Sequence, residues 1–258
     1  MARRLGLPVV AIPTIAATCA AWTPLSVWYS DAGQALNFEM FDDANFLVLV
    51  EPRIILNAPA EYLLAGIGDT LAKWYEAVVL APQPKALPLT VRLGINGALA
   101  IRDVLLDSSE TALADQRRGD LTQAFRDVVE AIIAGGGMVG GLGERYTRVA
   151  AAHAVHNGLT VLPQTDKFLH GTKVAYGILV QSALLGQDDV LAQLVTAYQR
   201  FNLPTTLREL DVDINNRDEL DRVIAHTLRP VESIHYLPVK LTPEILRAAF
   251  EKVESFNR

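Results

Sequence analysis

The sequence contains few of the residues that mark several classes of protein. Cys19 is the only cysteine among 258 residues, so a disulfide within the chain is impossible, which fits a reducing cytoplasm. The net charge is −6 at pH 7 and the pI is near 5.4. No nucleic-acid partner is expected, because phosphate contacts need a basic face. Apart from the uncharged stretch near the N-terminus, no apolar run approaches the ~20 residues of a membrane span, so no membrane partner is expected.

Two sequence motifs, one of metal hydrolases and one of dinucleotide-binding domains, are also missing. The sequence has no helical H-E-x-x-H pair, which disfavours a metal hydrolase. The only glycine-rich run, residues 134–143 (AGGGMVGGLG), follows a predicted helix instead of a strand. No acidic residue follows it at the distance typical of a dinucleotide-binding turn. We interpret this run as a loop between two helices.

The residues that are present indicate a chain with a full hydrophobic core. Half of them are hydrophobic and a fifth are charged, and the length suits one large or two modest domains. The first 22 residues carry two arginines and then an uncharged stretch, which is also the outline of a secretory signal peptide. Pro13 and several threonines weaken that apolar run.

Three of the five histidines lie between residues 149 and 177. His153 and His156 are one turn apart in an alanine-rich predicted helix, and His170 lies at the expected start of the next helix. Imidazole is the commonest protein ligand for a divalent transition metal, and two or three must converge to hold one. Asp69 is a candidate carboxylate for the same site. The pattern predicts a metal centre between facing helices; the alternative is a chance cluster of surface or core histidines.

Three segments resemble the metal-binding segments of glycerol dehydrogenases, in the group of iron- or zinc-containing alcohol dehydrogenases. They are residues 58–77 (APAEYLLAGIGDTLAKWYEA), 150–160 (AAAHAVHNGLT) and 168–177 (FLHGTKVAYG). The resemblance implies that Asp69, His153 and His170 are the metal ligands and that His156 faces substrate or cofactor. It extends from about Leu7 to the C-terminus, so we discount export and expect a cytoplasmic protein.

The fold that the resemblance implies is an α/β remnant of a dinucleotide-binding domain in residues 1–52, followed by an all-helical metal- and substrate-binding domain in residues 53–258. This is the dehydroquinate synthase-like fold of iron-containing alcohol dehydrogenases. Residues 8–12 and 46–50 read as buried strands, and residues 2–5 as the end of a helix stopped by Gly6. Residues 25–30 and 35–41 flank a turn signal at 31–34, which predicts a hairpin.

After Pro52 the apolar residues recur at three-to-four spacing, which predicts helices. Thr242 and Pro243 form an N-cap with proline at the first helical position. Ser108–Glu110 and Asp188–Asp189 also look like helix starts. The predicted helices span residues 60–80, 87–106, 121–133, 146–157, 171–185, 188–201, 217–226 and 243–255.

The resemblance also implies a nicotinamide cofactor, NAD or NADP, whose pyrophosphate lies on a glycine-rich turn in this family. No such turn follows a strand here, so we expect the chain to begin inside a longer protein. The segment PTIAAT matches the loop on the nicotinamide side; read without the resemblance, it is a plain strand–helix connection. The residues implied to contact the cofactor are Thr14, Ile15, Ala16, Ala17, Thr23, Leu25 and Tyr29.

Two departures from glycerol dehydrogenases bear on the substrate. Cys19 replaces an aspartate associated there with the polyol, which removes a negative charge from the pocket. Lys73 follows Asp69 by one helical turn and shares its face. It is either a salt-bridge partner of Asp69 or Glu76, a surface lysine, or the partner of a substrate carboxylate. His156, Cys19 and Lys73 are the candidate substrate contacts.

The expected function is therefore metal-dependent hydride transfer between NAD(P)H and a small 2-oxo acid, with Zn²⁺ as the preferred metal and Fe²⁺ as the alternative. The second hypothesis is the same chemistry on glycerol or another small polyol or hydroxyketone. A third is a truncated helical domain that binds metal without turnover. The apolar helical surfaces weakly favour a homo-oligomer.

Overall fold

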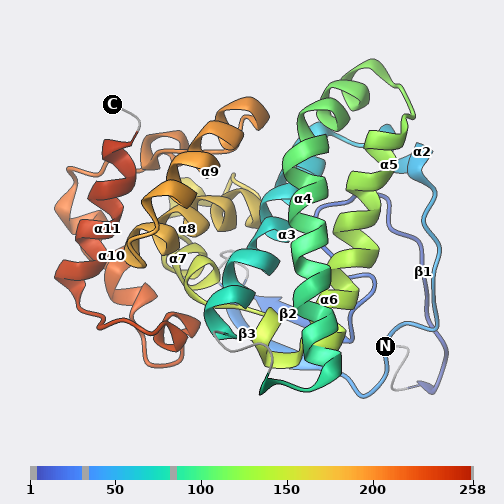
Figure 1. The fold of residues 1–258 in the computed structure, drawn as a ribbon, viewed down its shortest axis with the longest axis horizontal. Coiled ribbons are helices and arrows are strands. Elements are labelled where there is room, and N and C mark those ends of the chain that lie inside the picture. Colours follow the sequence, from blue (N-terminus) through green and yellow to red (C-terminus); the bar gives the residue numbers. More distant parts are fainter. Residues whose placement is uncertain (1–4, 31–34, 82–85, 257–258) are drawn as a thin grey trace.

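The computed structural model describes residues 5–30, 35–81 and 86–256, which form a series of packed helices preceded by two small pairs of strands (Figure 1). Strands β1 (Val10–Ala11) and β4 (Leu47–Val48) pair in parallel, and β2 (Leu25–Tyr29) and β3 (Ala35–Met40) form an antiparallel hairpin. A short α/β part is thus followed by an all-helical part, as predicted. The boundary between residues 52 and 53 stays a prediction.

The predicted hairpin is confirmed, and its turn at residues 31–34 lies outside the described residues. Of the helix end expected at residues 2–5, only Leu5 is described, and it is helical; Gly6 has a φ of +64°, which suits a stop. The prediction that the strands in residues 8–12 and 46–50 are buried was wrong. Val10 is 50% exposed and Phe46 75% exposed, because a parallel sheet is buried only when elements cover both of its faces, and the described residues supply no such cover.

The helical part runs from Pro52 to Ser255. Three predicted helices match end to end, and the Thr242 hydroxyl accepts a hydrogen bond from the Ile245 N–H, as an N-cap should. The helices are α2 (Pro52–Leu56), α3 (Ala60–Leu80), α4 (Leu89–Arg118), α5 (Gln123–Glu130), α6 (Gly136–Gly143), α7 (Ala151–Leu159), α8 (His170–Leu184), α9 (Asp188–Phe201), α10 (Arg217–Thr227) and α11 (Pro243–Ser255).

Two helix boundaries differ most from the prediction, and the other differences are three residues or fewer. The helix start expected at Ser108–Glu110 is wrong, because α4 continues through it to Gly119, which ends the helix in the left-handed conformation. Leu105, Ala112 and Leu113 are buried on one face, so the apolar repeat outweighs the local capping signal. The helix expected from residue 146 begins at Ala151, after a separate 3-10 turn, η3 (Glu144–Thr147).

The glycine-rich run is helical, so the expected loop was wrong. Residues 131–135 form a π-helical turn, η2 (Ala131–Gly135), and α6 follows directly. Close packing explains why. A Cβ at Gly137 would lie 2.5 Å from the Trp22 side chain, and a Cβ at Gly94 of α4 would lie 2.7 Å from the Gly143 nitrogen. Glycine costs a helix about 1 kcal/mol per residue, and the close contacts offset this cost.

Helix α3 lies between the group formed by α4, α5 and α6 and the group formed by α7 to α11 (Figure 1). Its middle section is buried on every side, and a continuous hydrophobic core runs from α3 through both groups. Within the described residues, no helix combines the length and apolar character of a membrane span.

Two glycines let α3 and α8 approach each other beside the histidines. A Cβ at Gly171 would lie 1.8 Å from the Ala65 carbonyl oxygen, and a Cβ at Gly68 would lie 2.4 Å from the Gly171 carbonyl oxygen. No real side chain tolerates such distances. The backbones of α3 and α8 therefore touch next to the positions from which the side chains of Asp69 and His170 project.

Gly171→Ala should destabilise the protein by about 1–3 kcal/mol, because the new methyl group forces α3 and α8 apart. Chemical denaturation followed by circular dichroism measures this loss. Gly141→Ala is the matched control: its Cβ would meet nothing within 4 Å, so it should be neutral or stabilise α6 by up to about 1 kcal/mol. Equal effects of the two variants would contradict the close-contact explanation.

Candidate metal centre

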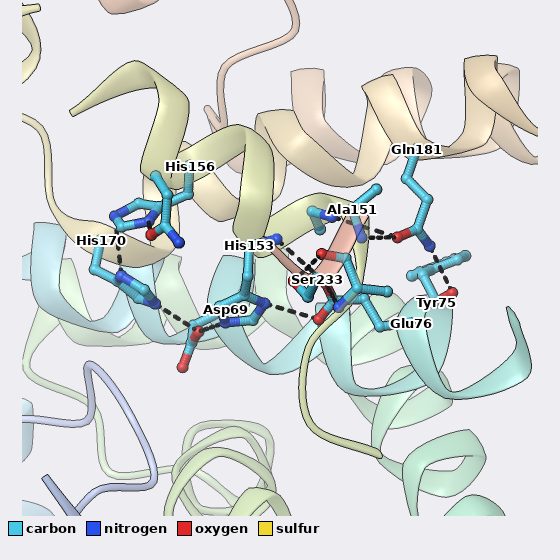
Figure 2. A network of polar contacts seen from close by, with 12 residues as sticks. Asp69, Tyr75, Glu76, Ala151, His153, His156, His170, Gln181 and Ser233 are labelled. Carbon is cyan, nitrogen blue, oxygen red and sulfur yellow. Dashed lines mark hydrogen bonds and ion pairs between the residues drawn. The ribbon is translucent and has the colours of Figure 1, made fainter. Parts of the chain in front are cut away.

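Three helices bring one carboxylate and two imidazoles together (Figure 2). Asp69 comes from the middle of α3, His153 from α7 and His170 from the first position of α8. The Asp69 Oδ1 atom lies 3.5 Å from His153 Nε2 and 3.3 Å from His170 Nε2. The three residues implied by the family resemblance thus converge, from positions up to 101 residues apart in sequence.

The spacing of these atoms fits a divalent metal. Zinc binds nitrogen and carboxylate oxygen at about 2.0–2.2 Å, so two ligands of a tetrahedral site lie about 3.4 Å apart. The two O···N distances in the structure bracket that value, and all three ligand atoms lie within 4.8 Å of one another. Two nitrogens and one oxygen are a donor set that zinc accepts with open positions for other ligands.

The charges at this centre are strongly coupled. Burial would raise the pKa of Asp69, which is 5% exposed, but contacts with His153 and His170 outweigh it and hold the pKa well below its ordinary value. Burial would likewise lower the pKa of His153, but the carboxylates of Glu76 and Asp69 raise it to about 9. Without a metal, the His153 ring therefore carries a second proton at neutral pH and is positively charged, beside an ionised Asp69.

Glu76 supports His153 from behind and is fully buried. Its Oε2 atom lies 2.7 Å from His153 Nδ1, while Oε1 accepts hydrogen bonds from the N–H groups of Ala150 at 2.6 Å and His153 at 3.2 Å. A carboxylate only accepts, so it holds a proton on Nδ1 and leaves Nε2 to face Asp69. Sequence reasoning missed this role, although Glu76 follows Asp69 by seven residues on the same helix face.

The N-cap residue of α7 makes no side-chain hydrogen bond, and side chains distant in sequence bind the backbone at the start of this helix instead (Figure 2). Gln181 of α8 accepts from the N–H groups of Ala151 and Ala152 at 3.1 and 3.3 Å, and its amide donates to the Tyr75 carbonyl at 2.7 Å. Ser233 donates to the Ala150 carbonyl at 2.5 Å. These bonds fix the turn that presents His153 to Asp69.

The ring of His156 is 2% exposed and lies against His170, with 4.2 Å between ring centroids. Its Nε2 atom is 3.0 Å from His170 Nδ1, and its Nδ1 atom is 3.0 Å from Asn157 Oδ1. Burial lowers the pKa of His156 well below its ordinary value, so the ring is neutral. The expected contact with substrate or cofactor disagrees with this geometry, because both ring nitrogens face protein groups.

Lys73 lies one turn from Asp69 and is half-buried. The expected alternative of a salt bridge is not supported: in the described structure, no ion pair joins Lys73 to Asp69 or Glu76. Burial alone would lower the pKa of Lys73, but Cys19, at the high pH where its thiol ionises, and the carboxylates of Asp69 and Glu76 raise it. The ammonium group is therefore charged and has open hydrogen-bonding capacity.

Cys19 and Arg148 lie within electrostatic range of Lys73. Burial raises the pKa of Cys19, so the thiol stays neutral, and its Cβ packs on α6 where a Gly136 side chain would be. Arg148, just before α7, touches the Met40 sulfur at 3.5 Å, and no described carboxylate pairs with it. Sequence reasoning did not single out Arg148.

The segment expected to contact the cofactor crosses the outside of α3. The Ala16 side chain is buried there, because Gly66 lets the Ala16 carbonyl approach α3, whereas Thr14 is exposed and Ile15 and Ala17 are half-buried. The Thr23 hydroxyl donates to the Ala20 carbonyl. Leu25 opens β2, and the side chain of Tyr29 lies outside the described part. Their contact with a dinucleotide stays a prediction.

Known proteins resemble the whole chain. Hydroxycarboxylate dehydrogenase A of Escherichia coli is 84% identical over 257 residues, which cover all of this chain and 71% of that protein. Glycerol dehydrogenase of Thermotoga maritima is 35% identical, again over the whole chain and 71% of the relative. The chain thus spans less than three quarters of the length of these relatives.

The solved structure of a probable glycerol dehydrogenase from Sinorhizobium meliloti superimposes with a TM-score of 0.88 at 30% identity, covering 99% of this chain and 72% of the other. No protein-family model matches the sequence. The identity to two curated dehydrogenases along the whole chain, and the agreement of the fold, decide its family. This chain belongs to the glycerol dehydrogenase-like family of the iron- or zinc-containing alcohol dehydrogenases.

Proposed function

We propose that this chain takes part in the metal-dependent reduction of small 2-oxo acids to 2-hydroxy acids with NADH or NADPH. The convergence of Asp69, His153 and His170 at distances suited to a divalent metal carries the proposal. The 84% identity to a protein named as a hydroxycarboxylate dehydrogenase supports the substrate class. In this proposal residues 1–52 belong to the cofactor-binding domain and residues 53–258 to the metal- and substrate-binding domain.

Asp69, His153 and His170 would hold the metal, with Zn²⁺ preferred and Fe²⁺ as the alternative. A bound divalent ion would polarise the substrate carbonyl and lower the pKa of the product hydroxyl. One carboxylate and two neutral imidazoles leave such a site with net positive charge, which favours an oxyanion. Glu76 holds the proton on His153 Nδ1, so that Nε2 presents a lone pair to the site.

The charges around the site favour an acidic substrate. Lys73, one turn from Asp69, and Arg148, within electrostatic range of Lys73, are two cations without a carboxylate ion pair in the described structure. A substrate carboxylate would supply the missing anion, and Arg and Lys are the side chains that recognise carboxylates. Neutral Cys19 adds no repulsion. The nicotinamide would lie along Thr14–Ala17, with Thr23, Leu25 and Tyr29 as further contacts.

A small polyol or hydroxyketone is the second candidate substrate, because several relatives at 33–37% identity are named glycerol dehydrogenases. Substrate-dependent oxidation of NADH and NADPH with added Zn²⁺ decides between the two. The assay compares a 2-oxo acid with a neutral hydroxyketone, on this chain and on a version extended upstream. Turnover of the hydroxyketone alone would overturn the acid assignment.

Asp69→Ala should weaken Zn²⁺ binding by about 100-fold or more, because it removes the only anionic ligand of the proposed site. Competition with a chelating dye measures the dissociation constant without requiring turnover. His235→Ala is the control, since His235 is exposed and its ring hydrogen-bonds to the backbone carbonyls of residues 228 and 229. Unchanged zinc affinity in Asp69→Ala would mean that the metal binds elsewhere.

Zinc affinity should rise with pH. The raised pKa of His153, about 9, means that a proton occupies the ring below that pH and competes with the metal. The dissociation constant should fall by up to about tenfold per pH unit as pH rises toward 9 and then level off. Glu76→Gln lowers the pKa of His153, so the levelling should occur at lower pH. The same chelator competition, repeated in a pH series, makes the measurement, and a pH-independent constant would count against this competition.

Lys73→Met should raise KM for a 2-oxo acid by about tenfold or more and leave KM for a neutral ketone nearly unchanged, because an ion pair with the substrate carboxylate is lost. Lys240→Met, at an exposed lysine far along the chain, is the matched control. Where turnover is too slow, calorimetric titration of the zinc-loaded protein with the acid and the ketone gives the same comparison. Equal effects on both ligands would rule out the carboxylate contact.

A further inference from the structure

A line of hydrogen bonds leads away from His170 through two residues of α7 to Glu232 and Arg229. His170 Nδ1 lies 3.0 Å from His156 Nε2, and His156 Nδ1 lies 3.0 Å from Asn157 Oδ1. The Asn157 amide donates to Glu232 Oε2 at 2.8 Å, and Arg229 donates to Glu232 Oε1 at 2.5 Å. We call these five residues the relay: His170, His156, Asn157, Glu232 and Arg229.

The hydrogen bonds of the relay can have only one order of donors and acceptors, and Glu232 determines that order. A carboxylate has no proton to donate, so Glu232 forces Asn157 to present its NH₂ group to Glu232 and its oxygen to His156. The His156 Nδ1 atom must then carry a proton. No described carboxylate forms an ion pair with the His156 ring, so nothing holds a second proton on it; its Nε2 atom accepts, and His170 Nδ1 must donate.

The outcome at His170 is a proton on Nδ1, which leaves Nε2 to face Asp69 at 3.3 Å. The imidazole is thereby fixed in the form that a metal needs at Nε2. Glu76 does the same for His153 by direct contact. The two histidines are thus oriented by two different buried carboxylates, one adjacent and one three hydrogen bonds away.

The burial of the relay makes this assignment strict. His156 is 2% exposed and Glu232 6% exposed, so bulk water cannot readily supply alternative partners. Arg229 compensates the buried charge of Glu232 and reaches solvent with its own side chain. A buried polar group that loses its partner costs about 1–3 kcal/mol, so a reversed orientation of one member requires all the others to reverse.

We infer that Glu232 is a positioning residue for the metal centre, acting through Asn157 and His156 to hold the proton on His170 Nδ1. This inference rests on the proposed metal role of His170. Glu232 touches neither the metal ligands nor the substrate region, and it lies 62 residues after His170 in sequence. Its effect is therefore exerted only through the relay.

Glu232→Gln tests the direction of the relay. Arg229 can only donate, so it takes the oxygen of the new side-chain amide and leaves the NH₂ group of that amide toward Asn157. Asn157 must then turn its oxygen to the new amide and its own NH₂ group to His156, which moves the ring protons to His156 Nε2 and His170 Nε2. The zinc dissociation constant should rise by about tenfold or more, as is usual when the partner of a metal-binding histidine is lost.

The double variant Asn157→Asp with Glu232→Gln should restore the original direction. The new carboxylate at position 157 would accept from both the amide NH₂ group at position 232 and His156 Nδ1. The proton then returns to His170 Nδ1, and zinc affinity should recover to within about threefold of the original. Glu251→Gln, at an exposed glutamate of α11, is the control for loss of one carboxylate. A merely structural role of Glu232 predicts no recovery in the double variant.

Two measurements decide the outcome. Chelator competition gives the zinc dissociation constants of all four proteins, and ¹⁵N NMR of the histidine rings shows which His170 nitrogen carries the proton, with and without zinc. A His170 Nδ1 proton that is lost in Glu232→Gln and regained in the double variant supports the inference. An unchanged ring in Glu232→Gln overturns it. Failure of the unaltered protein to bind zinc would instead overturn the proposed function, since the NMR result on metal-free protein tests the relay independently.

Discussion

The structure depends on one buried negative charge. The Asp69 carboxylate lies in the middle of a helix that is enclosed on all sides, where an unpaired ion is strongly unfavourable. Two groups from other helices compensate it at close range, His153 from α7 and His170 from α8. The crossing of α3 and α8 at Gly68 and Gly171 is what makes this compensation geometrically possible. The charge balance of the site therefore depends on the close packing of these helices.

Each histidine at Asp69 needs its own support, and the support differs in kind. Glu76 binds both the ring of His153 and the backbone that presents it, so one side chain fixes position and protonation together. His170 begins its helix and receives only a ring contact, from His156. The Ala150–Ala152 backbone is held in addition by Gln181 and Ser233. The effect of removing one supporting side chain therefore depends on which of the others remain, since members of a polar network do not contribute independently.

Sequence reasoning located the centre because its residues lie in recognisable local patterns. The spacing of His153 and His156 and the helix start at His170 are local, and the family resemblance singled out Asp69, already a candidate carboxylate, as the third ligand. The same reasoning missed Glu76, Gln181 and Glu232, because their partners are backbone groups or side chains far away in sequence. The family resemblance also implied that His156 faces substrate or cofactor, but a resemblance in sequence does not show which groups pack against the ring.

The errors in the fold have a common cause. Glycine signals a loop and a serine–acid pair signals a helix start when only local preference is considered. In residues 134–143 and 108–110, contacts with distant segments outweigh those preferences. The strands at residues 8–12 and 46–50 show the opposite case, since their apolar pattern predicts burial that the described residues do not provide.

The glycine-rich helix α6 has a further consequence for how the site region moves. A helix with glycine at most of its positions gains little stability from its own backbone, so its order comes from the segments that lie on it, including Cys19 and Trp22. Such a helix opens locally at low free energy. The amides of α6 would then exchange with solvent ahead of those in α3 and α8, and the wall of the site near Cys19 would loosen while Asp69 and its two histidines stay in place.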